Sequence, residues 1–393
     1  MVMDVEGRKK TGRISYQYDE RGRLAKKQFP GEITTRWCYN EMGLPLELTH
    51  EDGEGILDRY SYAYDLSGNR TGIRRQRRDI PEESGDYCYT YDPLGRLAQV
   101  SKDGSLLRSY QYDSFSNRTR MEDHAAGRTY AFTYDARNRL TAMEDGYTGR
   151  KEYNYDHRGN LTGKIEGGIL IQTYSYNAMN RLSKAWDGQG EEAAYLYNGL
   201  GQRIGRECRK RGTVLTERYL LDVTRPYHNL LGIEMERHIQ TFYYDGNVAA
   251  MEDVEDGMHY YLQDELGSPL RVNGYGKKAG EESRKGSCAL PDYLTYGYDE
   301  FGNDLYRELG ESGIPSPYDK QGEDQPFGYT GYRYDEISGT YFAQAREYQP
   351  KNGCFTAEDV IRGNGTVPQT LNRYGYCWGN PVGLVDLNGL YPA

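Results

Sequence analysis

The sequence predicts an all-β protein, in which stacked β-hairpins form a rolled or spiralling antiparallel sheet. We expect an open barrel or partial cocoon that ends in a C-terminal block of different texture. Three observations lead to this fold class. A short aromatic and turn-forming phrase recurs with a nearly fixed period. Each copy carries the turn residues of a β-hairpin. The composition is rich in tyrosine and glycine, with 40 Tyr against 8 Phe and 48 Gly in 393 residues.

The recurring phrase is cleanest at residues 153–161, where an alternating aromatic run leads into Asp156 and then Gly159. From Asp92 onward the anchoring acid or amide returns at intervals of 21, 22, 21, 21 and 21 residues. A fixed period of this length marks a repeat architecture. The anchors are Asp19, Asn40, Asp65, Asp92, Asp113, Asp135, Asp156, Asn177 and Asn198.

Each phrase predicts one hairpin. Tyr-x-Tyr places two rings on one face of a strand, because side chains alternate with a period of two. The anchor can hydrogen-bond its own backbone ahead, and Gly three residues later accepts a left-handed conformation. Asn138 and Asn180 replace that Gly with the next best residue, and Ser116 is the weakest substitute. A lone hairpin is only marginally stable, so the hairpins are expected to stack.

The excess of tyrosine favours a half-wet sheet, in which rings pack while hydroxyls reach water or partners, over a dry core. No apolar run approaches the ~20 residues of a membrane span. Residues 1–13 carry charges throughout and predict no secretory signal. We therefore expect that, if the protein is secreted or displayed on the cell surface, it leaves by a non-classical route.

The net charge of −10 is unevenly distributed. Residues 1–244 hold 37 Lys and Arg against 35 Asp and Glu, whereas residues 245–393 hold 12 against 24. An acidic C-terminal third argues against nucleic acid as a partner, because phosphate binding needs the opposite charge. We interpret the acidic excess as solvated surface; the alternative is a wall that orients or repels a charged cargo.

The cysteines are widely spaced, with no Cys-x-x-Cys pair, and the six histidines lie apart from them. A zinc site would need clustered ligands, so neither a metal nor another cofactor is expected. We predict free cysteines that pack as small hydrophobic side chains. They are Cys38, Cys88, Cys208, Cys288, Cys354 and Cys377.

We divide the chain into three parts. Residues 1–215 form the regular hairpin array, and residues 216–310 continue it with longer loops. Residues 311–393 form a terminal block with its own motifs. Residues 326–335 read Pro-Phe-Gly-Tyr-Thr-Gly-Tyr-Arg-Tyr-Asp, residues 345–350 read Ala-Arg-Glu-Tyr-Gln-Pro, and residues 386–390 read Asp-Leu-Asn-Gly-Leu.

This ordered set resembles the C-terminal core-associated region of Rhs proteins, and the hairpin phrases resemble YD repeats. The likeness to Rhs/YD-repeat proteins of the polymorphic toxin type covers essentially the whole chain. It implies a hollow shell around a C-terminal toxin, with the terminal block as a plug-like core that cuts the chain to free the toxin. It also implies partners, namely that toxin domain, which this chain does not contain, and its immunity protein or a secretion-system component.

Carried over onto matching positions, the resemblance implies an aspartyl pair at Asp359 and Asp386, with Arg346 beside it. The cut would fall between Leu390 and Tyr391. Two carboxylates held close cannot both ionise cheaply, so one keeps a proton while the other activates water. On this hypothesis the protein is at most a self-cleaving aspartic peptidase that acts in bacterial antagonism or toxin delivery.

Three positions depart from the family pattern. Leu387 and Val360 stand where Pro is usual, and Cys354 replaces the customary Arg. The alternative is therefore an orphan shell that no longer cuts, in which the two aspartates cap turns. A further alternative, from a different functional class, is a non-catalytic adhesion module whose tyrosine-rich strands bind surface glycans or proteins.

Overall fold

The computed structural model describes residues 2–6, 11–236, 238–254, 257–273, 293–306 and 325–392. Within these residues, 26 strands form one large antiparallel sheet and four more form a second, smaller sheet. Each strand of the large sheet pairs with the next strand along the chain. The predicted all-β fold of stacked hairpins is confirmed.

The strands of the first half of the large sheet are β1 (Val2–Glu6), β2 (Thr11–Tyr18), β3 (Leu24–Gln28), β4 (Thr34–Tyr39), β5 (Pro45–Asp52), β6 (Gly55–Tyr64), β7 (Arg70–Arg77), β8 (Gly85–Tyr91), β9 (Leu97–Lys102), β10 (Ser105–Tyr112), β11 (Arg118–Asp123), β12 (Arg128–Tyr134) and β13 (Leu140–Asp145).

The strands of its second half are β14 (Gly149–Tyr155), β15 (Leu161–Glu166), β16 (Ile169–Tyr176), β17 (Leu182–Trp186), β18 (Glu192–Tyr197), β19 (Arg203–Lys210), β20 (Thr213–Leu221), β21 (Leu230–Glu234), β22 (Ile239–Tyr244), β23 (Val248–Asp253), β24 (Gly257–Gln263), β25 (Pro269–Asn273) and β26 (Tyr293–Thr295). The small sheet contains β27 (Arg333–Asp335), β28 (Thr340–Ala343), β29 (Arg346–Gln349) and β30 (Cys354–Phe355). Short 3-10 helices are η1 (Pro81–Glu83), η2 (Tyr329–Gly331), η3 (Pro368–Leu371) and η4 (Cys377–Gly379).

The anchor residues form the predicted turns. Asp92 accepts hydrogen bonds on its side chain from the N–H groups of Leu94 and Arg96, at 2.9 and 3.0 Å. Gly95 donates its N–H to the Asp92 carbonyl at 2.9 Å and has a φ of +77°. The substitutes adopt the same left-handed conformation, with φ between +57° and +62°, at Ser116, Asn138 and Asn180. The left-handed conformation at this turn position explains why Gly and Asn recur there, with Ser116 as the exception.

The tyrosines of the phrase stabilise the stack of hairpins from its inner face. The first tyrosine is buried, as at Tyr89, which is 3% exposed. The second links neighbouring hairpins: the Tyr91 hydroxyl donates to the Arg70 carbonyl at 2.6 Å, and Tyr134 donates to Arg118 at 3.0 Å. The rings pack as predicted, and these two hydroxyls reach backbone carbonyls of the adjacent strand.

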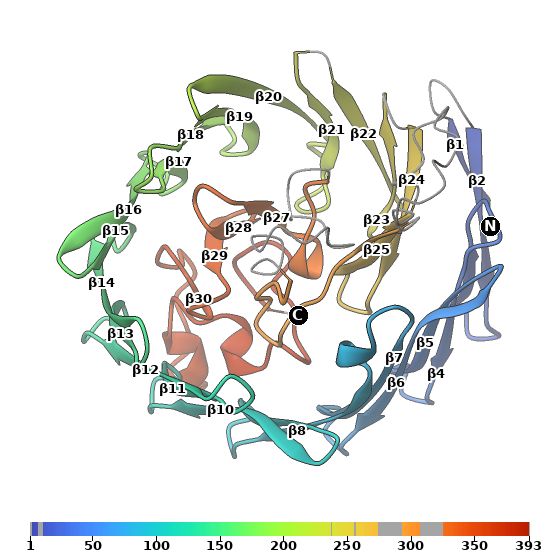
Figure 1. Cartoon of the computed structure of the whole chain (residues 1–393), viewed down its shortest axis with the longest axis horizontal. Helices are drawn as coiled ribbons and strands as arrows, with labels where there is room; N and C mark the ends of the chain where they lie inside the picture. The colour runs from blue at the N-terminus through green and yellow to red at the C-terminus, as the bar shows by residue number, and fades with distance from the viewer. Residues whose placement is uncertain are drawn as a thin grey trace, which may run out of the picture.

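The large sheet rolls up until its last strands lie inside its first ones (Figure 1). Ala250 of β23 and Leu262 of β24 join Ile14 of β2 and Leu57 of β6 in one buried apolar cluster. Among the described strands, β1 pairs with β2 alone and β26 with β25 alone, so the roll stays open, as predicted. We call this overlap of early and late strands the seam.

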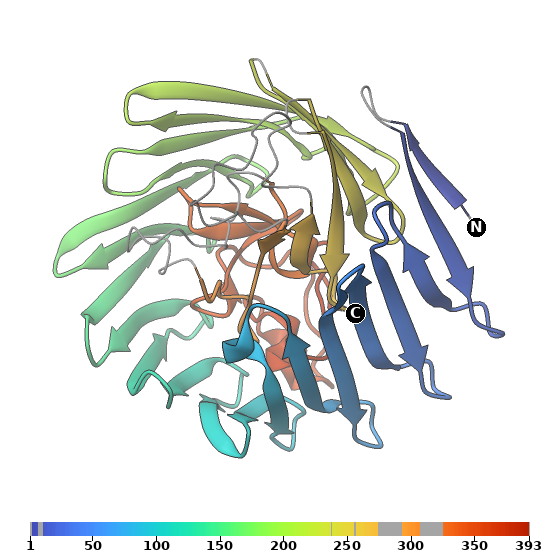
Figure 2. The same cartoon turned by 45° about the vertical axis from the view of Figure 1, so that its right-hand side comes forward.

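The C-terminal residues 325–392, here named the plug, lie inside the roll (Figures 1 and 2). Ile337 of the plug packs in one apolar cluster with Tyr174 and Leu182 of the roll, and Val382 packs in another with Tyr89. This position agrees with the expected plug-like core. The three-part division at residues 215 and 310 stays a prediction.

Basic side chains on the inner face of the roll pair with acidic side chains of later segments. Arg108 contacts Glu300 at 2.8 Å, and Arg206 contacts Asp335 at 3.0 Å; both acids are buried. The interpretation of the acidic C-terminal third as solvated surface is wrong for such residues, because they neutralise the lining of the roll. The same pairing joins Lys27 to Asp245, Arg70 to Glu265 and Arg203 to Glu347.

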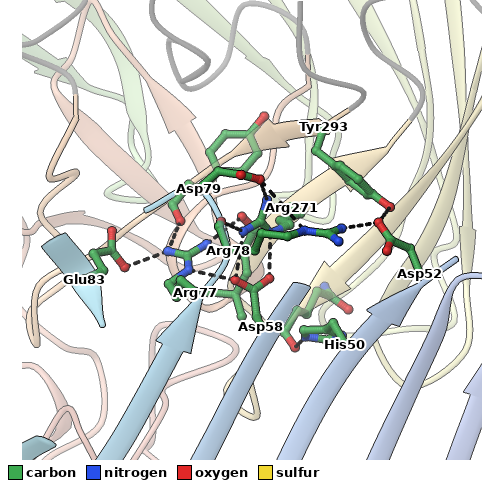
Figure 3. A network of polar contacts seen from close by, with 12 residues as sticks. His50, Asp52, Asp58, Arg77, Arg78, Asp79, Glu83, Arg271 and Tyr293 are labelled. Atoms are coloured by element: carbon green, nitrogen blue, oxygen red, sulfur yellow. Dashed lines mark hydrogen bonds and ion pairs between the residues drawn. The ribbon is translucent and has the colours of Figure 1, made fainter. Parts of the chain in front are cut away.

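Asp58 of β6 lies at the centre of a buried polar network at the seam (Figure 3). Its carboxylate accepts hydrogen bonds from Nε of Arg77 on β7 at 3.0 Å and from Nε of Arg271 on β25 at 2.7 Å. None of these three side chains is more than 2% exposed. Nearby, His50 donates from Nε2 to the Gln263 carbonyl at 3.1 Å. The network joins the first and last parts of the roll.

The cysteine prediction is only partly right. All five described cysteines are free, and Cys208 and Cys377 are buried as predicted. Cys38 and Cys88 are exposed, because each lies between two residues whose side chains turn inward, and alternation along a strand directs it outward. Cys354 is partly buried, and Cys288 lies outside the described residues.

Candidate active site

Arg346, the first residue of β29, is the fixed point of the candidate site. Its guanidinium carbon lies 3.7 Å from the ring centroid of Phe355 on the neighbouring strand β30. Nε donates to the Gly389 carbonyl at 2.5 Å, and Nη1 donates to the Arg373 carbonyl at 2.9 Å. The side chain is 6% exposed, so stacking and hydrogen bonds leave it one orientation.

The remaining guanidinium nitrogen, Nη2, holds both predicted carboxylates. It lies 2.8 Å from Oδ2 of Asp359 and 3.5 Å from Oδ2 of Asp386. Asp359 is 8% exposed and Asp386 is 1% exposed. The fold thus brings together the three side chains that the resemblance implied, although the two aspartates are far apart along the chain.

The other oxygen of each carboxylate caps a turn. Oδ1 of Asp359 accepts a hydrogen bond from the Ile361 N–H at 2.7 Å. Oδ1 of Asp386 accepts from the N–H groups of Leu390 at 2.9 Å and Tyr391 at 3.0 Å. In each aspartate, therefore, Oδ1 caps a turn, as the alternative interpretation expected, while Oδ2 contacts Arg346 as part of the pair.

Burial governs the electrostatics of the pair. It raises the pKa of Asp359 and of Asp386 above the usual range, and the Arg346 charge opposes this rise at both. For Asp386, the neighbouring Asp359 charge raises the pKa further, whereas the Leu390 and Tyr391 N–H groups lower it. The Arg373 charge also lowers the pKa of Asp359, so the two carboxyl groups differ in their surroundings.

The peptide between Leu390 and Tyr391 runs directly past Asp386. The Ala345 N–H donates to the Asn388 carbonyl at 3.1 Å, which fixes the approach to this peptide. Gly389 has a φ of +70°, and a Cβ there would lie 2.2 Å from the Ala343 carbonyl oxygen, so only Gly fits. The predicted cleavage position thus lies next to Asp386.

Three residues of the site were not found from the sequence. Arg373 donates to the Asp359 carbonyl and pairs with Glu358, and the Tyr332 hydroxyl donates to the Asp386 carbonyl. Asn388 accepts from the N–H of Leu390. The spacing of two residues from Asn388 to Leu390 is typical of an Asx turn and was an available signal. Nothing local marked the other two.

Among the residues that the structure describes, no group of three or more His, Cys, Asp and Glu side chains is placed to hold a metal ion. No helix in this described part is both long and apolar enough to cross a membrane.

Comparisons with known proteins identify relatives over nearly the whole chain. The tRNA3(Ser)-specific nuclease WapA of Bacillus spizizenii is 28% identical over 391 residues, which cover 98% of this chain and 15% of the nuclease. Toxin subunit YenC1 of Yersinia entomophaga is 23% identical over 393 residues, with 91% and 37% covered. Mouse Teneurin-1 is 25% identical over 361 residues, with 88% and 12% covered. The chain therefore spans only a minor part of these relatives.

The fold has solved counterparts. The crystal structure of TcdB2-TccC3-TEV superposes with a TM-score of 0.69 at 16% identity, over 97% of this chain and 20% of that one. The Tc holotoxin pore of Photorhabdus luminescens gives 0.61 at 17% identity, over 98% and 20%. The sequence profile of the Teneurin YD-shell family matches residues 59–285, more than half of the chain. The protein belongs to this YD-shell family of Rhs/YD-repeat proteins.

Proposed function

We propose that this chain is a toxin-carrying Rhs shell whose plug cuts its own peptide bond after Leu390. One observation carries the proposal: the two buried aspartates share Nη2 of Arg346, and Oδ1 of Asp386 lies 3.0 Å from the Tyr391 nitrogen. A paired carboxyl and carboxylate next to a peptide bond is the arrangement that acid–base hydrolysis needs.

The 2.8 Å contact with Arg346 favours Asp359 as the ionised partner, and the distance to the Tyr391 nitrogen favours Asp386 as the acid. In the proposed reaction, Asp359 accepts a proton from a water molecule whose oxygen attacks the Leu390 carbonyl carbon. Asp386 gives its proton to the Tyr391 nitrogen as the C–N bond breaks. The products are the Leu390 carboxyl group and the free Tyr391 amine, and the pair keeps one proton.

Arg346 has two roles in this scheme. Its charge keeps one of the two carboxyl groups ionised in a buried site. Its Nε, 2.5 Å from the Gly389 carbonyl, holds the chain one peptide before the bond that breaks. Because the reaction needs one protonated and one ionised aspartate, we expect the cleavage rate to fall at both acidic and alkaline pH.

The names of the relatives support a role in toxin delivery. They include a toxin subunit from Yersinia entomophaga and a double-stranded DNA deaminase toxin from Burkholderia cenocepacia. On this proposal the partner is a toxin domain encoded after Ala393, with an immunity protein that protects the producing cell, and the protein is exported. Sequencing the coding region beyond Ala393 tests this: a small domain there supports the proposal, and a stop codon contradicts it.

Cleavage is tested by extending the chain beyond Ala393 with a reporter domain and following its release by gel electrophoresis. The wild type should split after Leu390. Asp359→Asn and Asp386→Asn should each stop the cut, because either change removes half of the proton-sharing pair and keeps its shape. If the wild type stays intact and Leu387→Pro splits, the chain is a disabled member of the family. If neither splits, the peptidase proposal is wrong and only the shell remains.

A further inference from the structure

Asn388 contacts the same two peptide N–H groups as Asp386. Its Oδ1 accepts from the Leu390 N–H at 3.0 Å and from the Tyr391 N–H at 3.3 Å. Oδ1 of Asp386 accepts from these groups at 2.9 and 3.0 Å. Two donors are therefore shared between one ionisable acceptor and one acceptor that stays neutral at every pH.

This sharing matters because Asp386 has conflicting tasks. As an acceptor of two N–H groups it is stabilised in its charged form. As the proton donor to the Tyr391 nitrogen it must be in its neutral form. When Oδ1 of Asp386 carries the proton that points at the Tyr391 nitrogen, it accepts hydrogen bonds from these N–H groups less well than the carboxylate does. The Asn388 amide oxygen removes the conflict, since it remains an acceptor when Asp386 takes up a proton.

Asn388 is itself held in place from both sides. Its backbone carbonyl accepts the Ala345 N–H at 3.1 Å. The next residue, Gly389, is pressed against the Ala343 carbonyl so closely that a Cβ would lie 2.2 Å from the oxygen. The Asn388 side chain can therefore hold the Leu390–Tyr391 peptide beside Asp386 whether Asp386 is protonated or ionised.

We propose that Asn388 is a positioning residue for self-cleavage, which holds the amide of the bond after Leu390 so that Asp386 is free to act as its acid. This inference rests on the proposed function and deepens it. It assigns Asn388 a role in orientation and in proton availability, with no direct part in bond making or breaking.

The test compares first-order cleavage rates of the reporter-extended chain over a range of pH. In Asn388→Ala, Asp386 becomes the sole acceptor of both N–H groups and its anion is stabilised. Cleavage should slow between roughly tenfold and a hundredfold, as expected when a reacting group loses its alignment. The alkaline side of the pH profile should also move to lower pH, which a purely structural defect would not produce.

Two further variants sharpen the result. Asn388→Asp supplies a neutral carboxyl acceptor in acid, so at acidic pH it should cleave faster than Asn388→Ala. Asn364 is the matched control, because its Oδ1 accepts the Thr366 N–H at 3.0 Å with the same spacing in an exposed turn. Asn364→Ala should leave the rate and the pH profile unchanged.

The failures can be told apart. If the wild type does not cleave at any pH, the proposed function falls and the role of Asn388 falls with it. If the wild type cleaves and Asn388→Ala cleaves equally fast with the same pH profile, only the inference about Asn388 is overturned. If Asn388→Ala is inactive, a rise of activity in Asn388→Asp at acidic pH supports the inference. The absence of that rise, with near-ultraviolet circular dichroism unchanged, contradicts it.

Discussion

Asp58→Asn should destabilise the roll far more than an equivalent change at the surface. The Asp58 carboxylate balances the charges of two buried guanidiniums, Arg77 and Arg271. In Asp58→Asn that negative charge is lost, and the amide NH2 group would face an arginine N–H group in place of an acceptor oxygen. Arg77 keeps Glu83, 2.6 Å from its Nη1, but Arg271 loses its buried partner. Removing one partner of a buried ion pair costs about 3–5 kcal/mol, and we expect a loss in this range.

The matched control is Asp86→Asn. Asp86 also pairs with an arginine of β7, since it lies 2.5 Å from Arg74, but these side chains are 52% and 73% exposed. Exposed pairs of this kind contribute little to stability, because water and salt screen their charges. The two variants therefore make the same chemical change next to the same strand and differ in burial.

Urea unfolding followed by tryptophan fluorescence gives the free energy of unfolding of each variant. The account predicts that Asp58→Asn loses several times more than Asp86→Asn, with similar slopes against urea. Equal losses in the two variants would refute the argument that buried charge pairs hold the seam.

Two other predictions concern stability. Burial lowers the pKa of His50 to about 4 from its ordinary 6.5, so the unfolded chain takes up this proton first as the pH falls. The His50 contribution to the free energy of unfolding should therefore fall by roughly 3 kcal/mol between pH 6.5 and 4. Thermal unfolding over that range should show a smaller loss in His50→Gln than in the wild type, and equal losses would contradict the buried, neutral His50. Tyr91→Phe deletes the 2.6 Å hydroxyl bond to the Arg70 carbonyl and should cost about 1 kcal/mol in urea unfolding, and a variant as stable as the wild type would contradict the role of this hydroxyl as a link between hairpins.

The hairpin array could be predicted because its determinants are local. The choice of Gly95, Asn138 and Asn180 follows from a positive φ at one turn position, and the whole turn lies within five residues. The same locality explains why the repeat period predicted a stack of hairpins. The register at which the stack rolls up depends on contacts between distant residues, such as Asp58 with Arg271, and no local pattern encodes it.

The charge interpretation was wrong for a related reason. A count of acidic residues gives their number and not their positions, so buried acids such as Glu300 and Asp335 could not be separated from solvated ones. Their basic partners are spread over the hairpins, where Arg108 and Arg206 looked like ordinary members of a balanced segment.

In the candidate site, too, some residues could be predicted from the sequence and others could not. Asp359, Asp386 and Arg346 were named from family motifs, and the fold brings them together. Tyr332 and Arg373 support the site through backbone carbonyls, and residue identity alone does not reveal such contacts. Their roles depend on how the small sheet, β27–β30, packs against residues 386–391, and this packing is not visible in the sequence.

The central claim is that the plug cuts the bond between Leu390 and Tyr391, and intact-mass spectrometry of the purified chain tests it most directly. During incubation at mildly acidic and neutral pH, the wild type should lose the tripeptide Tyr391-Pro392-Ala393, whereas Asp386→Asn should keep its full mass. A wild-type chain that keeps its full mass throughout, together with a Leu387→Pro chain that does the same, would contradict the claim.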